Sequence, residues 1–293
     1  MRWRIGLVLC AVLAGCGGAP AAKLAAPAPA PTATVVGEQR IGPRVLDLTV
    51  RSTALGRTAK VRLLQPDRGR RPWPVLYLLH GCCDSYQSWT RSTDVARIPA
   101  LRRVLVVMPE GGEVGFYSDW RDGPRWETFH TRELPRLLAR YGAGTRRAIA
   151  GLSMGGLGAM DYAARHPGLF AAAASFSGVL HPLSEPKIWL GLFSAYTDDP
   201  RAVWGDPDKD RDTWAEHDPT ELAARLRGVR LFVSSGNGPH DQTEVIVGRE
   251  SRAFARRLRA LRIPARLDFY GPGRHDWPYW QRELHRALPT LLG

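Results

Sequence analysis

The stretch Arg147-Ala-Ile-Ala-Gly151-Leu152-Ser153-Met154-Gly155-Gly156 decides the fold of this chain. It begins as a short apolar run typical of a buried strand, continues as Gly-x-Ser-x-Gly, and leads into residues 156–165, which favour a helix. A serine at so sharp a turn takes a strained backbone conformation, and glycines two residues to each side remove side chains that would clash. The pattern predicts an exposed Ser153 hydroxyl at a helix N-terminus, where the helix dipole favours developing negative charge.

Outside this motif, short β-branched runs alternate with amphipathic stretches, which indicates a mostly parallel sheet with helices on both faces. An opening hairpin is expected over residues 45–51 and 60–64, and buried strands over 74–79, 103–108, 147–150, 171–176, 230–234 and 266–270. Helices are expected over residues 126–141, 156–165 and 249–261. The segment at about 179–220 shows neither the alternation of a strand nor the periodicity of an amphipathic helix. We predict that it forms an inserted cap over the sheet.

The N-terminus has the pattern of an export signal. Two arginines precede an apolar stretch, residues 5–13, that is too short to span a bilayer. The stretch ends in Leu13-Ala14-Gly15-Cys16, which looks like a bacterial lipobox. We therefore expect a signal peptide over 1–15, lipidation of Cys16, an Ala/Pro-rich tether over 16–40 and a catalytic domain over 41–293. The protein would be anchored to the outer face of the membrane; an ordinary secretory signal is the alternative.

The formal net charge of +13 comes mainly from arginines scattered along the chain. Nucleic-acid binding proteins tend to gather such residues in one run or stripe, so we expect no nucleic-acid partner. The sequence contains no phosphate-binding loop, no His-Glu-x-x-His and no Cys/His cluster with zinc spacing. We expect no cofactor and no metal, and a monomer whose partners are a small-molecule or lipid ester and, through the anchor, the membrane.

The hydroxyl of Ser153 needs a base, because a serine is a poor nucleophile by itself. His275 comes just after the last predicted strand, which is where enzymes with this type of serine turn carry their histidine, in the chain order serine, acid, histidine. Asp241 is the first carboxylate after the strand over 230–234, so the general order of elements selects it as the acid.

The loop His80-Gly81-Cys82-Cys83 directly follows a predicted buried strand. In such enzymes this loop supplies one backbone N–H of the oxyanion hole, here that of Cys82, and the residue after the nucleophile, Met154, supplies the other. His80, Gly81 and Trp277 are the expected substrate contacts. The adjacent cysteines could be a redox device, a vicinal disulfide or simply small residues.

From about Val75 to Trp280 the chain resembles the actinobacterial mycolyltransferases, within the wider esterase-D-like group of α/β-hydrolases. The resemblance implies an α/β-hydrolase fold, a catalytic Ser153 and His275, and an acid at Glu244 in place of Asp241, which would then order the loop or cap a helix. The matching motifs are Phe116-Tyr-Ser-Asp-Trp120, Trp126-Glu-Thr-Phe129, Glu133-Leu-Pro135, Gly151-Leu-Ser-Met-Gly155, Val203-Trp-Gly205, His217-Asp-Pro219, Ser235-Gly-Asn-Gly238 and His275-Asp-Trp-Pro-Tyr-Trp280.

Three positions depart from that family. The mycolyltransferases carry an acidic residue before the oxyanion glycine and an arginine two residues after it, both implicated in trehalose binding, where this chain has His80 and Cys83. The serine that usually follows the catalytic histidine is Asp276 here. The departures argue against trehalose as the acceptor and leave the acyl-transfer groups intact.

Three hypotheses for the function follow. The first is an exported serine carboxylesterase that works through an acyl-enzyme on Ser153. The second keeps that acyl-enzyme but moves the acyl chain to a sugar or lipid alcohol. The third is a catalytically silent binding protein of the cell envelope, which would have no physical need for Ser153 and His275.

Overall fold

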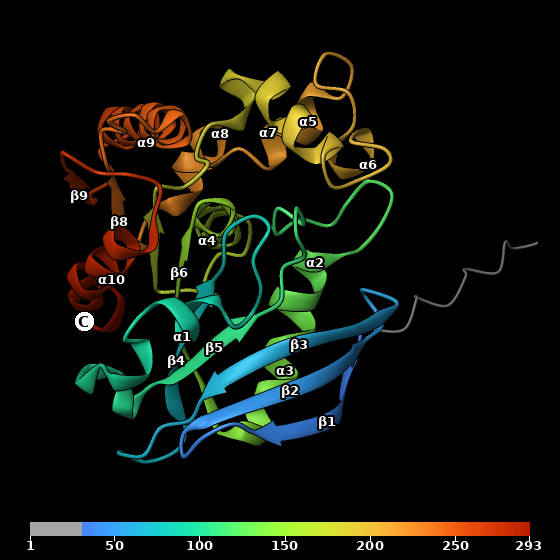
Figure 1. Cartoon of the computed structure of the whole chain (residues 1–293), viewed down its shortest axis with the longest axis vertical. Helices are drawn as coiled ribbons and strands as arrows, with labels where there is room; N and C mark the ends of the chain where they lie inside the picture. Colours follow the sequence, from blue (N-terminus) through green and yellow to red (C-terminus); the bar gives the residue numbers. More distant parts are fainter. Residues whose placement is uncertain (1–30) are drawn as a thin grey trace, which may run out of the picture. The chain divides into compact units, whose positions relative to one another are not determined.

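The computed structural model describes residues 31–293, which fold around a nine-stranded sheet of order β1-β2-β3-β5-β4-β6-β7-β8-β9 (Figure 1). The first three strands and β5 pair antiparallel, and the pairs from β5 through β4 to β9 are parallel. The predicted mostly parallel sheet is therefore confirmed. The strands are β1 (Ala33–Arg40), β2 (Val45–Ser52), β3 (Arg57–Leu64), β4 (Trp73–Leu79), β5 (Leu105–Pro109), β6 (Ala143–Leu152), β7 (Ala172–Phe176), β8 (Arg230–Ser235) and β9 (Arg266–Phe269).

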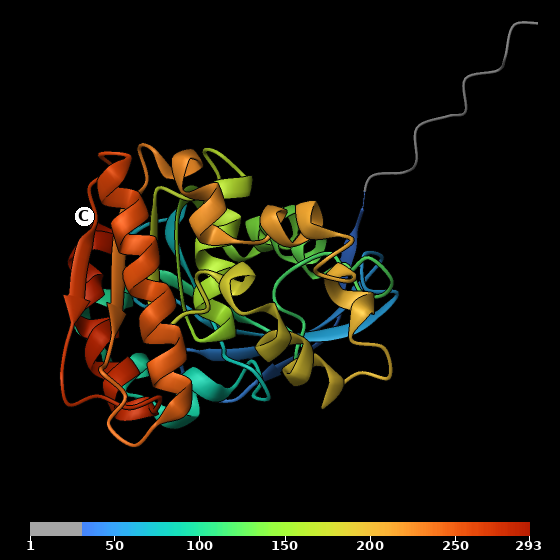
Figure 2. The same ribbon diagram turned by 90° about the horizontal axis from the view of Figure 1, so that it is seen from above.

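Helices cover both faces of the sheet because its central strands are apolar on both sides (Figure 2). In β4, Val75, Tyr77 and Leu79 pack into the core beneath α4 (Met154–Arg165) and α9 (Gln242–Ala260). The alternate residues Leu76 and Leu78 pack on the opposite face with α1 (Ser88–Ser92) and α10 (Trp277–Leu292). Each central strand thus separates two hydrophobic cores.

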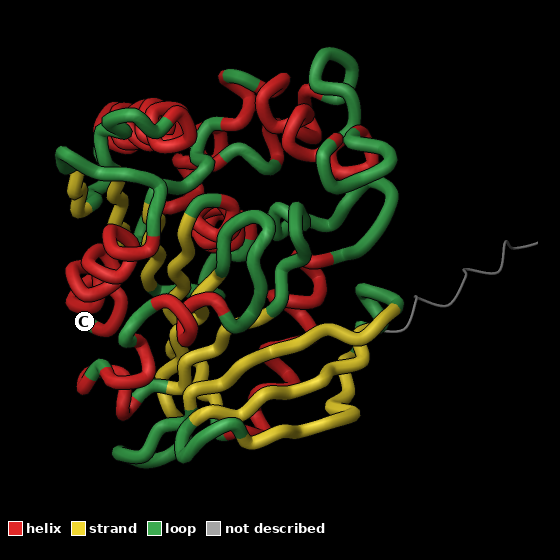
Figure 3. The backbone as a smooth tube through the Cα atoms, in the orientation of Figure 1, coloured by secondary structure: helices red, strands yellow, loops and turns green. Residues whose placement is uncertain are grey.

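The predicted cap is a run of short helices between β7 and β8, which Figure 3 shows as short red turns joined by green loops. Its helices are α5 (Pro186–Ser194), α6 (Arg201–Trp204), α7 (Arg211–Glu216) and α8 (Pro219–Leu222). An aromatic cluster stabilises it: Trp204 lies 5.6 Å from Phe193 and 5.1 Å from Trp214 between ring centroids. Phe193 in turn contacts Phe116 of the loop after β5, at 4.7 Å, which attaches the cap to the domain.

The two largest errors in the predicted boundaries concern β1 and α9. Residues 33–40 belong to β1 and not to the tether, because they pair with β2 as an edge strand. The helix predicted over 249–261 starts earlier, at Gln242, because the side chain of Asp241 caps it. The proposed signal peptide and Cys16 lie outside the described residues.

The predicted helix over residues 126–141 is present but irregular. It runs through α2 (Trp126–Thr128), a π-helical turn (Phe129–Glu133), α3 (Leu134–Leu138) and a 3₁₀ turn (Ala139–Tyr141). Pro135 lacks the N–H that a regular α-helix needs, which accounts for the change of hydrogen bonding before it. Other 3₁₀ turns are Val95–Arg97, Pro99–Arg103, Pro182–Ser184 and Ala223–Leu226.

The carboxyl ends of the parallel strands meet at one edge of the sheet. The loops after β4, β6, β7, β8 and β9 carry residues 80–85, Ser153, Ser177, residues 236–241 and residues 270–276. Ligands of open α/β sheets bind at this edge, so the fold gathers the predicted site residues where a site is expected. In the described part of the chain, no helix has the length and apolar composition that crossing a membrane requires.

Candidate active site

Ser153 occupies the sharp turn between β6 and α4. Its backbone angles are φ 52° and ψ −122°, a sparsely populated region that costs an L-residue about 1–3 kcal/mol. Backbone hydrogen bonds hold the turn: the N–H of Ser153 donates to Phe176 at 3.0 Å, and its carbonyl accepts from Gly156 at 2.9 Å. A Cβ at Gly151 would overlap the carbonyl oxygen of Gly155, which explains the glycine before the turn.

His275 is oriented by Glu244, which lies in the first turn of α9. Glu244 Oε2 is 2.9 Å from His275 Nδ1, and Oε1 accepts hydrogen bonds from Ser177 Oγ and the Gly236 N–H. The carboxylate is fully buried, so its contact with the imidazole is screened little by water. Among the described residues His275 Nε2 has no hydrogen-bond partner, which leaves it free to take a proton.

Asp241 contacts the same histidine through the backbone. Its Oδ2 accepts from the His275 N–H at 2.7 Å and its Oδ1 accepts from the Glu244 N–H at 3.1 Å. Partial burial works against ionisation, but these two hydrogen bonds hold the pKa of Asp241 below its ordinary value. The alternative acid thus caps α9 and orders the loop, as the sequence comparison of the two carboxylates predicted.

A short chain of contacts connects the serine to the histidine. Ser153 bonds to the backbone of Phe176, the neighbouring Ser177 bonds to Glu244, and Glu244 bonds to His275. Ser177 has a φ of 47°, so the turn after β7 is also strained. The connection runs through the backbone of the serine turn, and among the described residues no hydrogen bond joins Ser153 Oγ to His275 Nε2.

The loop after β4 packs directly against the serine turn. A Cβ on Gly81 would lie 2.6 Å from Leu152 Cδ1 and 3.3 Å from Ser153 Cβ, and a Cβ on Gly155 would lie 2.5 Å from the carbonyl oxygens of Leu79 and His80. Only glycines permit so close an approach. Among the described residues, neither the Cys82 N–H nor the Met154 N–H donates to a protein acceptor, so both remain available to a substrate oxygen.

The side chain of His80 does not face a substrate, contrary to our prediction. Only 1% of the surface of His80 is exposed. Its Nδ1 lies 2.8 Å from the Gly81 carbonyl oxygen, and its Nε2 accepts a hydrogen bond from the Gly111 N–H at 2.8 Å. The ring points into the core because two backbone groups there need partners. His80 thus stabilises the loop after β4 from its buried side. Cys82 and Cys83, whose state the sequence left open, form a disulfide.

Trp277 lies half-buried beside His275. It packs edge-on against Trp89 of α1 and Trp280 of α10, at 5.5 and 5.2 Å between ring centroids. Trp280 also contacts the imidazole of His275, at 4.9 Å. The histidine therefore has a carboxylate on one side and an aromatic wall on the other.

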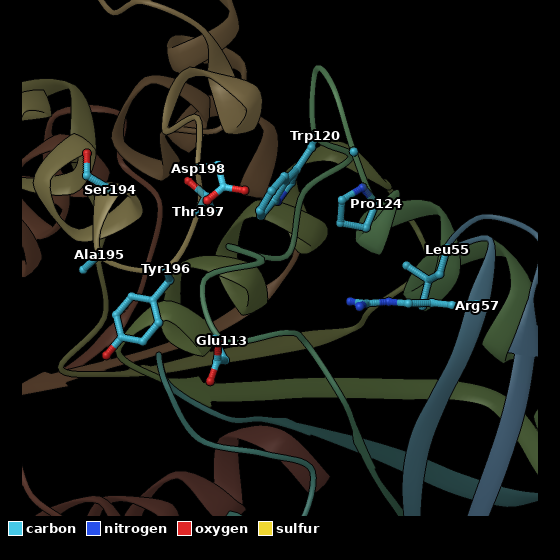
Figure 4. A pocket seen from close by; sticks show the side chains of 11 residues that line it. Leu55, Arg57, Glu113, Trp120, Pro124, Ser194, Ala195, Tyr196, Thr197 and Asp198 are labelled. Carbon is cyan, nitrogen blue, oxygen red and sulfur yellow. The ribbon is translucent and has the colours of Figure 1, made fainter.

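A cavity lined by Asp84 and Ser85 lies next to the disulfide in the chain. Two cavities of about 800 and 690 Å³ share Arg57, Glu113, Trp120, Pro124 and Tyr196 in their linings. Figure 4 shows Trp120 and Pro124 across the larger cavity from residues 194–198 of the cap. Ser153 and His275 line neither cavity. Glu113 connects both cavities to the loop after β4, because its carbonyl accepts a hydrogen bond from the Cys83 N–H at 2.9 Å.

Glu127, Asp161 and His217 are the residues best arranged to hold a metal, since their ligating atoms lie within 4.8 Å of one another and all three are buried. The three side chains already contact partners within the protein. Arg165 and His166 contact Glu127 at 3.0 and 2.7 Å, and His217 contacts Asp161 at 3.0 Å. Burial disfavours the Glu127 carboxylate, but these partners lower its pKa to about 2. The arrangement is a buried polar network that joins α2 and α4 to the cap.

Glu250 is a structural residue of the site that the sequence did not reveal. Its carboxylate accepts from the N–H groups of Leu180 and His181 at 2.8 and 3.1 Å, and from Trp189 Nε1 at 3.1 Å. Burial raises its pKa to about 8 in spite of those hydrogen bonds. Glu250 lies on α9 within two turns of Glu244, so one helix carries the histidine's carboxylate and also anchors the start of the cap. Sequence spacing carries no signal for such a tertiary contact.

A serine turn after a central strand, an acid after a later strand and a histidine after the last strand define the α/β-hydrolase class of proteins. The model of the esterase family, described as putative esterases, matches residues 52–291, and the chain belongs to this family. The family and the relatives named below indicate an esterase or an acyltransferase.

The relatives place the chain in the actinobacterial mycolyltransferase-like branch. The chain is 32% identical to the diacylglycerol acyltransferase/mycolyltransferase Ag85B of Mycolicibacterium smegmatis, over 89% of this chain and 88% of that protein. It is 34% identical to the esterase Rv1288 of Mycobacterium tuberculosis, over 78% of this chain and 55% of that protein. Among solved structures, MPT51 (FbpC1) of Mycobacterium tuberculosis matches with a TM-score of 0.71 at 28% identity, over 83% of this chain and 96% of that chain.

Proposed function

We propose that this protein is an exported serine carboxylesterase with a Ser153–His275–Glu244 triad. The observation that carries the proposal is the 2.9 Å contact between Glu244 Oε2 and His275 Nδ1. A carboxylate on Nδ1 holds the proton there and leaves Nε2 as the acceptor for the serine proton. The strained backbone of Ser153 supports the role of its hydroxyl as nucleophile, because strain at a serine turn persists where the surroundings enforce it.

The reaction has two halves. His275 Nε2 takes the proton of Ser153 as Oγ attacks the ester carbonyl, and the N–H groups of Cys82 and Met154 stabilise the oxyanion. The imidazolium then gives its proton to the departing alcohol, which leaves an acyl-enzyme. Water, deprotonated by the same nitrogen, hydrolyses the acyl-enzyme. Gly81 and Trp277 are the proposed substrate contacts.

Hydrolysis of chromogenic esters from acetate to palmitate tests this proposal. Ser153→Ala should lose roughly a millionfold in turnover, as loss of the serine does in triad hydrolases. Ser184→Ala, a change at an exposed serine of the cap, serves as the matched control and should keep wild-type turnover. Near-normal turnover in a folded Ser153→Ala protein would show that another group is the nucleophile.

A second candidate function is acyl transfer to a sugar or lipid alcohol. The similarity to Ag85B over most of both chains favours it. The same acyl-enzyme would be attacked by an alcohol instead of water, so the first half of the reaction is unchanged. Adding candidate alcohols to the ester assay distinguishes the two, because transfer produces a new ester at the expense of free acid. A silent envelope-binding protein would show neither product.

Export remains a proposal based on the N-terminal sequence. The apolar stretch over residues 5–13 and the Leu-Ala-Gly-Cys16 sequence support a lipoprotein signal and an anchor at the outer face of the membrane.

A further inference from the structure

The two donors of the proposed oxyanion hole are held in different ways. Met154 is the first residue of α4, so the direction of its N–H is set by the first turn of that helix. Cys82 lies in the loop after β4, outside any helix or strand. The direction of its N–H therefore depends on the contacts that hold this loop.

Three successive peptides of the loop are each held by one hydrogen bond. The peptide between Gly81 and Cys82 is held through its carbonyl oxygen, which lies 2.8 Å from Nδ1 of His80. In the peptide before it, the His80 carbonyl accepts from the Tyr117 hydroxyl at 3.0 Å. In the peptide after it, the Cys83 N–H donates to a backbone carbonyl at 2.9 Å. The peptide that contains the Cys82 N–H thus depends on His80.

The Gly81 carbonyl fixes the direction of the Cys82 N–H, because the peptide bond is planar and trans and the two groups point in opposite directions. The His80 ring is buried, so the carbonyl that it binds points toward the core. The Cys82 N–H then points away from the core. It has no acceptor among residues 31–293, which leaves it available to a substrate oxygen.

Without this hydrogen bond, the peptide after Gly81 would turn easily. The residue must be a glycine, because a Cβ there would lie 2.6 Å from Leu152 Cδ1, yet glycine restricts its own ψ angle least of all residues. Within the described part of the chain, His80 Nδ1 is the only donor to the Gly81 carbonyl. The close approach to the serine turn requires a flexible residue, and the preceding histidine supplies the missing restraint.

The other ring nitrogen of His80 fixes the tautomer. The Gly111 N–H can only donate, so Nε2, at 2.8 Å, accepts from it and carries no proton. The proton then lies on Nδ1, where the Gly81 carbonyl needs a donor. The Gly111 N–H also lies 3.2 Å from Glu110 Oε1 and so has a second acceptor.

We propose that His80 is a positioning residue for catalysis: through Nδ1 it holds the Gly81 carbonyl and so aims the Cys82 N–H at the substrate oxyanion. The inference rests on the proposed serine esterase function. It gives the two ring nitrogens different tasks. The Nδ1 contact acts on the rate of the reaction, and the Nε2 contact acts on the stability of the loop.

Two amide variants of the full-length protein separate the two nitrogens. His80→Asn places an NH₂ group at the position of Nδ1 but does not extend to that of Nε2, so it should keep near wild-type kcat on chromogenic esters. His80→Gln extends to the position of Nε2 and has no donor at that of Nδ1. Losing an oxyanion donor outright costs about 10²–10³ in kcat, so the misdirected donor in His80→Gln should cost roughly 10- to 100-fold.

Two further readouts distinguish positioning from stability. KM of His80→Gln should change little, because the Cys82 N–H acts on charge that develops in the transition state. His80→Asn should lower the melting temperature by about 2–4 °C, because the Gly111 N–H loses one of its two acceptors. His217→Asn, a change at another buried histidine that lies in the cap, is the matched control and should lower the melting temperature at wild-type kcat.

A trifluoromethyl ketone tests the oxyanion hole directly. Ser153 Oγ adds to its carbonyl carbon, His275 takes the serine proton, and the ketone oxygen becomes an oxyanion. Its inhibition constant should rise in His80→Gln by about the same factor as kcat falls, and it should stay near the wild-type value in His80→Asn.

Wild-type kcat in a folded His80→Gln protein would overturn the inference, as would an equal loss of kcat in the two variants. A merely structural histidine would lower both melting temperatures without a difference in kcat at a temperature where both variants stay folded. If His80→Gln does not fold, His80→Asn must still combine a lowered melting temperature with near wild-type kcat, and a loss of its kcat contradicts the inference. Failure of the proposed function gives a different result, since the wild-type protein would then hydrolyse no ester.

Discussion

Replacing Glu244 by glutamine is the sharpest test of the triad, because the structure dictates how the new amide must lie. Oε1 of Glu244 accepts from two donors, Ser177 Oγ and the Gly236 N–H, and the second of these can only donate. The glutamine oxygen must therefore stay on that side. Its NH₂ group then faces His275 Nδ1, where it donates and forces the proton onto Nε2, the atom that has to accept the serine proton.

The wrong tautomer should lower turnover by roughly 10⁴-fold, equivalent to about 5.4 kcal/mol of transition-state stabilisation. Asp241→Asn is the matched control, since it removes a charge from the same loop but contacts only the backbone of His275. One of its two N–H partners loses an acceptor, a loss of about 1 kcal/mol, so turnover should stay within about 10-fold of wild type. Steady-state kinetics on one chromogenic ester suffices. A larger loss in Asp241→Asn than in Glu244→Gln would refute the assignment of the acid.

The remaining predictions concern the core, the cap, the N-terminus and the acceptor. Gly155→Ala, whose Cβ would lie 2.5 Å from two carbonyl oxygens, should destabilise the fold by about 3 kcal/mol in denaturant titrations, whereas Gly191→Ala, with open space around it, should be neutral or stabilising. Because burial raises the pKa of Glu250 from 4.5 to about 8, its contribution to stability is full below about pH 4.5 and is lost as the pH rises toward 8; Glu250→Gln should flatten the fall in melting temperature over that range. Mass spectrometry of the mature N-terminus should find a lipid on Cys16, and an unmodified terminus cleaved elsewhere would contradict the lipobox. Trehalose should be a poor acyl acceptor, so faster formation of trehalose esters than of free acid would contradict the departures from the mycolyltransferase pattern.

The parts of the site that depend on backbone geometry could be predicted from the sequence. The glycines around Ser153 appear in the sequence because a Cβ at those positions would meet other backbone atoms, and this constraint holds wherever the turn occurs. The capping role of Asp241 likewise follows a local rule, although the sequence predicted the start of that helix only at residue 249. The choice between Asp241 and Glu244 needed the family resemblance, because both carboxylates lie within one turn of chain.

Other features depended on contacts between distant residues. Strand β1 was missed because its residues alternate between half-buried and exposed at the edge of the sheet, and because it directly follows an Ala/Pro-rich stretch. The orientation of His80 could not be predicted either. The sequence shows that His80 precedes the oxyanion glycine Gly81. Its ring turns inward because the N–H of Gly111, 31 residues later, needs a hydrogen-bond acceptor.

Contacts between distant residues also give α9 two roles that its sequence does not reveal. Glu244 and Glu250 point to different partners, the imidazole on one side and the first residues of the cap on the other. Because both lie on one helix that is packed against β8, a shift of the cap has to move the helix or break the hydrogen bonds to Glu250. The Trp189 Nε1 donor comes from α5, whose last residue, Ser194, lines the larger cavity in Figure 4. Glu250 thus links α5 and the start of the cap to the same helix that carries Glu244, the carboxylate in contact with His275.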